Sequence, residues 1–177
     1  SRGLGDVYKR QWFSMNYPSD WNEFEDGEGS FLFYNPDVWT GNFRISAFKG
    51  KAGYGKDVIR QELKENDSAS LVKVGTWECA YSKEMFQEEG TYYTSHQWIP
   101  GTGNIAFECS FTVPKGGSTK EAEEVIATLE ARKEGEKYPA ELIPVRLSEI
   151  YQINEGYEWV VSTVKQELKK DFQGVEE

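Results

Sequence analysis

Short apolar segments that alternate with polar residues recur between residues 12 and 113, and turn residues separate them. A period of two is typical of a β-strand with one buried face, and closely spaced turns join neighbouring strands in antiparallel order. We therefore expect an α+β domain with an antiparallel sheet of seven or eight strands flanked by helices. The strands fit residues 12–17, 21–25, 31–34, 43–48, 71–74, 77–81, 91–99 and 105–113. The first of these should open the sheet and the last should close it.

Two helices are predicted within this domain. The first has Asp57 as its N-cap and extends to about residue 65, with Ile59 and Leu63 on its inner face. The second follows the last strand, where Ser118 and Glu121 fit the S-x-x-E capping box. One apolar stripe marks its buried side, formed by Ala122, Val125, Ile126 and Leu129. The helices should cover a thin, aromatic-rich sheet, because the chain has 6 Trp, 10 Tyr and 10 Phe residues.

The chain changes character after the domain at residues 12–132. Residues 133–147 are charged and contain Pro139 and Pro144, which is typical of a linker. Residues 148–177 form a helical appendage, with an amphipathic helix expected at residues 155–172. This helix either folds back onto the sheet or opens a second domain.

The first eleven residues, SRGLGDVYKRQ, match the translation of a common sequencing-library adaptor at every position. We interpret residues 1–11 as an adaptor artefact and exclude them from the fold prediction. On this interpretation the native N-terminus is not in the sequence, so the compartment has to be judged from cysteine usage.

Charge and cysteine content limit the function classes. The formal net charge of −10 argues against nucleic acid and against an anionic membrane surface as partners. It serves solubility, or it gives an acidic face that recognises a basic partner. No apolar run approaches the ~18 residues of a membrane span. Two cysteines are too few for a disulfide framework, which favours the cytoplasm. Export is the alternative, because the native N-terminus is missing on the adaptor interpretation. Cys79 and Cys109 are expected to be buried thiols, or to pair if their strands are neighbours.

Residues 50–57, GKAGYGKD, resemble the phosphate-binding pattern G-x-x-x-x-G-K-[ST] and follow a strand. Asp57 stands where that pattern needs a hydroxyl, and it would place a carboxylate beside the phosphates. The preceding strand also alternates, whereas the strand before a phosphate loop is buried on both faces. We interpret the segment as a flexible loop that leads into the helix.

The remaining chemistry-bearing residues suggest no catalytic centre, no metal site and no cofactor. His96 is the single histidine and lies on a predicted strand, where we expect a surface or hydrogen-bonded role. The acidic run contains Glu23, Glu25, Asp26 and Glu28. Its spacing does not fit a calcium-binding loop, so these carboxylates are expected to be solvated charges that protect an edge strand.

Three segments together resemble the PsbP-like family. They are the strand that ends Tyr17-Pro18-Ser19-Asp20-Trp21, the meander of aromatic strands, and the run FECSFTVP followed by STKEAEEVIATLEA. The resemblance covers roughly residues 12–132. It implies the fold of the photosystem II extrinsic subunit, of the Ran-binding Mog protein and of many bacterial proteins of unknown function. It also implies binding to other proteins, in some members as toxin-blocking immunity proteins, and no shared catalytic apparatus.

We therefore expect a non-enzymatic bacterial module that binds another protein. Trp39, Asn42 and Tyr54 are the candidate partner-binding residues, because the two rings lie outside clean strand alternation. The alternative is a carbohydrate-binding module in which the same loop aromatics stack on sugars.

Overall fold

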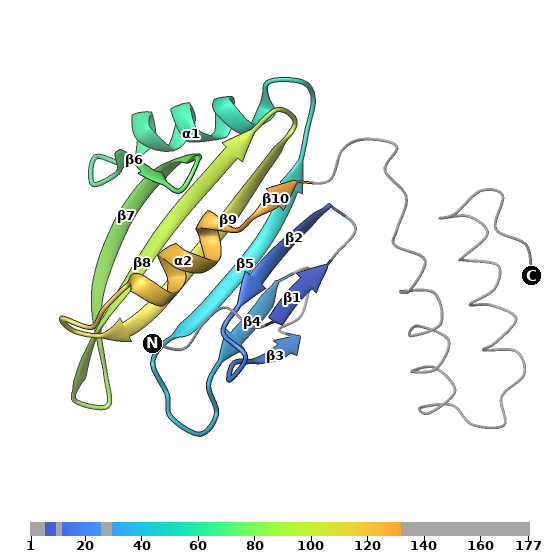
Figure 1. Ribbon diagram of the computed structural model, residues 1–177. Helices are drawn as coiled ribbons and strands as arrows, with labels where there is room; N and C mark the ends of the chain where they lie inside the picture. The colour runs from blue at the N-terminus through green and yellow to red at the C-terminus, as the bar shows by residue number, and fades with distance from the viewer. Residues whose placement is uncertain (1–5, 10–11, 26–29, 132–177) are drawn as a thin grey trace, which may run out of the picture. The chain divides into compact units, whose positions relative to one another are not determined.

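The computed structural model describes residues 6–9, 12–25 and 30–131, which form two sheets and two helices (Figure 1). The helices are α1 (Tyr54–Glu65) and α2 (Lys120–Ala127). The strands are β1 (Asp6–Lys9), β2 (Phe13–Tyr17), β3 (Asn22–Glu25), β4 (Phe31–Tyr34), β5 (Asn42–Lys49), β6 (Ser70–Val74), β7 (Trp77–Glu88), β8 (Thr91–Thr102), β9 (Ile105–Pro114) and β10 (Glu130–Ala131).

The chain divides into two units, residues 1–132 and residues 133–177. The predicted turn at residues 26–29, the linker at 133–147 and the helix at 155–172 lie outside the described residues.

Seven strands form the main sheet in the order β3-β4-β5-β9-β8-β7-β6, and every neighbouring pair is antiparallel. The predicted α+β class and antiparallel sheet are confirmed. The strand predicted at residues 77–81 is longer than expected, because β7 continues to Glu88 and pairs with β8 along its whole length.

The strand predicted to open the main sheet lies elsewhere. β2 belongs to a separate three-stranded sheet in the order β1-β2-β10. The physical reason is its packing: Phe13 and Met15 are buried against the main sheet, while the backbone of β2 pairs with β10 through Ser14 opposite Glu130. β1 pairs with the other edge of β2 and comes from the segment set apart as an adaptor. The adaptor interpretation concerns the origin of that segment and stays a prediction.

Alternation gives the main sheet an inner and an outer face. The inner face meets α2 and the small sheet, and Figure 1 shows α2, β2 and β10 in front of it. Phe43, Trp98, Phe107 and Phe111 on this face are almost completely buried. The ring of Phe13 in β2 meets the ring of Phe107 edge-on at 5.3 Å between centroids, which joins the two layers.

α1 covers only one end of the outer face. Ile59 of the helix packs with Ala80 of β7 and Ile99 of β8 in a small second core. The helix starts at Tyr54 with Gly53 at the N-cap, so the prediction of Asp57 as N-cap was wrong. Asp57 lies in the first turn and forms an exposed ion pair with Arg60 at 3.0 Å.

α2 follows the last strand of the main sheet as predicted, but its start differs by one residue. Thr119 is the N-cap, and the Ser118 hydroxyl accepts a hydrogen bond from the Lys120 amide at 3.2 Å. The predicted capping box of Ser118 and Glu121 is therefore not formed as such. The helix ends at Ala127, because Thr128 turns the chain so that β10 can pair with β2.

Replacing Gly55 by Ala should destabilise the protein, although Ala is the better helix former by about 1 kcal/mol. A Cβ atom there would lie closer than 3.0 Å to backbone atoms of Thr102 and Ile105. Forcing atoms into such a packed contact costs about 1–3 kcal/mol, so the net effect is a loss of stability. Urea denaturation of Gly55→Ala measures it, with the exposed neighbour Lys56→Ala as the matched control. A Gly55→Ala variant as stable as the control would contradict this packing.

Candidate functional site

The distal half of the β7–β8 hairpin extends beyond the edge strand β6. β6 pairs with β7 only as far as Tyr81, which lies opposite Ser70. Among the described strands, none pairs with the outer edge of β7 from residue 82 to residue 88. The hairpin closes with Glu88 opposite Thr91, and Glu89 and Gly90 both have positive φ, at 48° and 81°. Two such residues make the tight turn that suits a twisted hairpin. We call residues 82–95 the β7–β8 arm.

Three aromatic rings meet on the outer face near the tip of this arm. Phe86 and Tyr93 lie opposite each other on β7 and β8, and their rings stack at 5.5 Å with an interplanar angle of 24°. The ring of Trp39 stands nearly perpendicular to that of Tyr93, at 6.2 Å and 79°. Trp39 is 39% exposed and Phe86 is 37% exposed. We call Trp39, Phe86 and Tyr93 the aromatic corner.

The loop that presents Trp39 is held by buried groups. Asn35 is only 4% exposed, and its Oδ1 accepts hydrogen bonds from the amides of Asp37 and Val38 at 2.9 and 3.0 Å. Its Nδ2 donates to Oδ2 of Asp20 at 3.2 Å. The Trp39 indole Nε1–H donates to Oδ1 of Asn42 at 2.7 Å. Hydrogen bonds therefore hold both the backbone just before Trp39 and the Trp39 ring itself.

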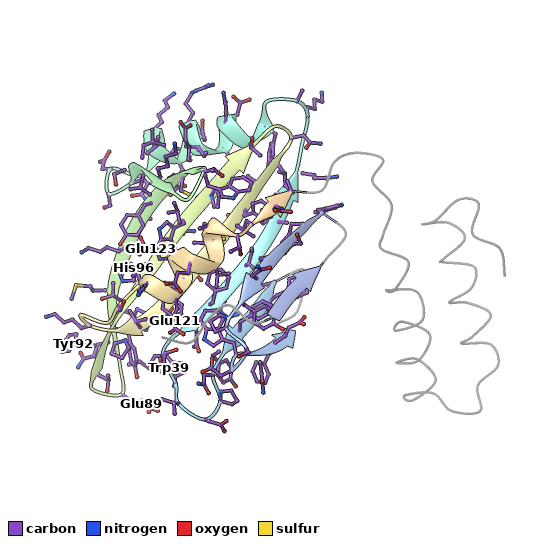
Figure 2. The ribbon with its side chains drawn as sticks, viewed as in Figure 1. Trp39, Glu89, Tyr92, His96, Glu121 and Glu123 are labelled. Carbon is purple, nitrogen blue, oxygen red and sulfur yellow. The ribbon has the colours of Figure 1, made fainter. Side chains whose placement is uncertain are left out.

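The structure brings together two of the three predicted binding residues. Trp39 and Asn42 are hydrogen-bonded partners in the aromatic corner, whereas Tyr54 begins α1 at the other end of β9. Gly55 packs against Ile105, where β9 begins, and Tyr93 lies opposite Pro114, where β9 ends. That separation is about 30 Å of extended strand. Figure 2 shows Trp39, together with Glu89 and Tyr92 of the hairpin, at the end of the sheet away from α1.

Phe86 and Tyr93 were not among the binding residues predicted from the sequence. The signal was present in the Glu89-Gly90 turn, because a two-residue hairpin loop there places Phe86 opposite Tyr93.

The glycine loop leads into α1 as predicted, but it is packed against the β8–β9 turn rather than flexible. The Gly50 amide donates to the Asn104 carbonyl at 2.8 Å, and the Gly55 amide donates to the Gly103 carbonyl at 3.1 Å. Amides that would have to face a phosphate are thus already paired with the β8–β9 turn. The ring of Tyr54 lies over Gly50, where a side chain would collide with it.

Cys79 and Cys109 are buried free thiols. Cys79 on β7 lies opposite Pro100, and Cys109 on β9 lies opposite Trp98, so β8 separates them. Two strands with one strand between them lie about 10 Å apart, which exceeds the Cα–Cα distance that a disulfide can span. Burial raises the pKa of Cys79 to about 12 and raises that of Cys109 well above its ordinary value, so both thiols stay protonated at neutral pH.

His96 lies on the inner face beside α2, in a cluster that sequence reasoning missed. The Tyr81 hydroxyl and Nδ1 of His96 are 2.6 Å apart and share a hydrogen bond, which confirms the expected hydrogen-bonded role. The imidazole also stacks on the indole of Trp98, at 6.0 Å and 25°. Figure 2 shows Glu123 of α2 close to His96.

Two forces lower the pKa of His96: burial of the ring and the positive charge of Lys83 directly across on β7. The carboxylate of Glu123 opposes them in part. Burial raises the pKa of Tyr81, and Glu123 raises it further. At neutral pH both side chains are therefore uncharged, and the cluster is suited to packing α2 against the sheet.

Within the described residues, no group of three or more His, Cys, Asp and Glu side chains could hold a metal ion. None of the helices in that part of the chain is long and apolar enough to cross a membrane.

This α+β chain belongs to the family described as Domain of unknown function (DUF3805), whose family model matches residues 7–154. A comparison with curated proteins found no match. Among solved structures, the chain is 90% identical to a crystal structure from Bacteroides thetaiotaomicron VPI-5482, with a TM-score of 0.78. The match covers 98% of this chain and 66% of that chain, so the sequence spans less than two thirds of that relative.

Two distant structures also match. LpqN, involved in cell envelope biogenesis of Mycobacterium tuberculosis, is 13% identical with a TM-score of 0.45, over 68% of this chain and 83% of LpqN. Cyanobacterial PsbP from Synechocystis is 14% identical with a TM-score of 0.34, over 75% of this chain and 97% of PsbP. At these scores the α+β assignment rests on the strands and their register.

Stability should fall with acidity in a way that depends on His96. Because its folded pKa lies below the ordinary value of 6.5, the unfolded chain binds the proton more tightly. The contribution of neutral His96 to the free energy of unfolding is fully present above pH 6.5. It is lost as the pH drops through 6.5 towards the lowered pKa of His96 in the folded state. Denaturation midpoints from pH 8 to pH 5 for the wild type and His96→Gln test this. The difference between the two profiles should change across that window, and parallel profiles would contradict it.

Proposed function

We propose that this chain is a non-enzymatic protein-binding module whose partner contacts the aromatic corner and the β7–β8 arm. One observation supports this above the others. The described residues expose seven large apolar side chains, and five of them lie at this end of the sheet. The five are Val38, Trp39, Met85, Phe86 and Tyr92. Trp39 and Phe86 adjoin Tyr93 on the outer face, whereas Met85 and Tyr92 lie on the inner face of the arm.

Contiguous exposed apolar side chains, such as Trp39 and Phe86 on either side of Tyr93, mark interaction surfaces more often than scattered ones do. Aromatic rings are also the side chains that most often dominate binding energy at protein interfaces. The rings of the corner are held in place before any partner arrives, so little conformational entropy is lost on binding.

The open edge of β7 supports the same class of function. Over residues 82–88 the edge offers backbone N–H and C=O groups to which a strand of a partner could pair. Lys83 and Glu84 are exposed there, and charged side chains of this kind limit indiscriminate edge pairing. The edge is therefore suited to one complementary partner rather than to aggregation.

Charge and thiols bear on the partner and the compartment. The net charge of −10 favours a protein partner over nucleic acid or an anionic membrane. The protonated, free thiols of Cys79 and Cys109 are consistent with a reducing compartment such as the bacterial cytoplasm.

Photo-cross-linking from the arm tests this proposal. The full chain would carry p-benzoylphenylalanine in place of Phe86 and be expressed in Bacteroides thetaiotaomicron, the source of the 90% identical structure. We expect one discrete protein adduct. The matched control places the same photo-reactive residue at Leu71, which is exposed on β6 outside this end of the sheet.

Equal or absent labelling at the two positions would overturn the proposal. Adducts with polysaccharide instead of protein would favour the carbohydrate-binding alternative. The carbohydrate-binding alternative needs the rings of Tyr54 and Trp39 on one surface, but Tyr54 begins α1 and Trp39 lies beside Tyr93 at the other end of the sheet.

A further inference from the structure

We infer that the aromatic corner binds a cationic side chain, Arg or Lys, from a basic segment of the partner protein. The inference rests on the proposed function and specifies the chemistry of its partner. Three features of the described residues support it: the arrangement of the rings, the carboxylates beside them, and the cations that this chain places over two of its other rings.

The rings form two walls rather than one flat platform. Phe86 and Tyr93 are stacked close to parallel, and Trp39 stands almost at a right angle to Tyr93. A cation seated in such an angle meets the electron-rich face of one ring and is enclosed by the next. A planar guanidinium can also stack on an exposed ring face.

Two carboxylates flank the corner on the same face. Glu84 and Glu88 lie two residues on either side of Phe86 along β7, so each is displaced by about 7 Å and points to the outer face. Both are exposed, and among the described residues neither takes part in an ion pair. Arg44 shares the outer face and lies on β5, two residues beyond Asn42. The immediate surroundings of Phe86 are nevertheless acidic.

The inner face of the same arm has the opposite character. Lys83 and Tyr92 lie there, and Nζ of Lys115 sits over the Tyr92 ring at 5.9 Å from its centroid. Elsewhere on the inner side, Nζ of Lys49 sits over Trp12 at 5.6 Å.

This chain thus supplies its own cation to the exposed ring of Tyr92 and to the partly buried ring of Trp12. Within the described residues, no Lys or Arg lies over Trp39, Phe86 or Tyr93. The aromatic corner therefore combines exposed rings and unpaired carboxylates without an internal cation, and charge complementarity identifies a basic segment as its occupant.

The test is an NMR titration of the full ¹⁵N-labelled chain with N-acetylarginine amide, which mimics one arginine of a peptide. We expect weak, saturable shifts of the Trp39 indole N–H and of the Phe86 and Tyr93 amides, reduced by added salt. The neutral N-acetylnorleucine amide serves as the probe control and should leave these signals in place.

Two double variants then distinguish the effect of the carboxylates beside the aromatic corner from the effect of the protein's overall negative charge. Glu84→Gln with Glu88→Gln should weaken binding of the arginine probe by roughly fivefold. Glu78→Gln with Glu108→Gln changes the same number of exposed carboxylates on the outer face away from the corner, and it should leave binding unchanged.

The inference is overturned if the arginine probe leaves the corner signals unshifted, if the neutral probe shifts them equally, or if both double variants behave alike. Substitutions to Gln at exposed strand positions should preserve the fold. Amide signals that keep their wild-type positions outside the substituted sites confirm that each variant is native. A protein adduct at Phe86 together with a failed titration would leave the protein-binding module standing and remove only its cationic partner.

Discussion

The rest of the structure depends on the packing of the inward-facing side chains of β9. Phe107, Cys109 and Phe111 follow one another on this central strand and are completely buried. The Phe107 ring meets Phe13 of the small sheet and, edge-on at 5.7 Å, Trp77 of β7, while Phe111 stacks with Trp21 at 6.0 Å. One strand thus joins both sheets and both halves of the main sheet. Since truncating a buried aromatic costs about 3–5 kcal/mol, these rings contribute on the scale of a domain's whole stability.

Concentrating the large side chains on the inner face leaves the outer face thinly covered. α1 protects only the end near Ile59, and the remaining outer positions of β9 are polar, as in Glu108, Ser110 and Thr112. The rings of the aromatic corner are the exception at the opposite end. They are exposed because no element of the described chain packs over them. A sheet with one face for stability and one for solvent can expose such rings without weakening its own core.

Much of the fold could be predicted because it follows from local alternation. The strands around Phe43 and Phe107 and the helix stripe around Val125 emerge from period alone. The small sheet could not be predicted in the same way. β2 pairs with β10 across more than a hundred residues, and nothing in the local pattern of Phe13 and Met15 distinguishes an inner strand of one sheet from an edge strand of another. Helix starts also differed by up to four residues, from the predicted N-cap Asp57 to the observed Gly53, since glycine packing at Gly55 determined where α1 begins.

The candidate site shows the same division between local and non-local information. Trp39 was predicted as a binding residue because its ring lies outside the strand alternation, but its hydrogen bond to Asn42 depends on a loop held by the buried Asn35. Phe86 follows the apolar Met85 and has Glu84 and Glu88 on its own face, so it gives no apolar alternation. Its place beside Tyr93 follows only from the register of the hairpin. A surface assembled in this way is rigid before binding, because a buried side chain holds the loop and ladder hydrogen bonds hold the strands. Rigid rings lose little entropy on contact, so even a small corner can add selectivity to a larger interface.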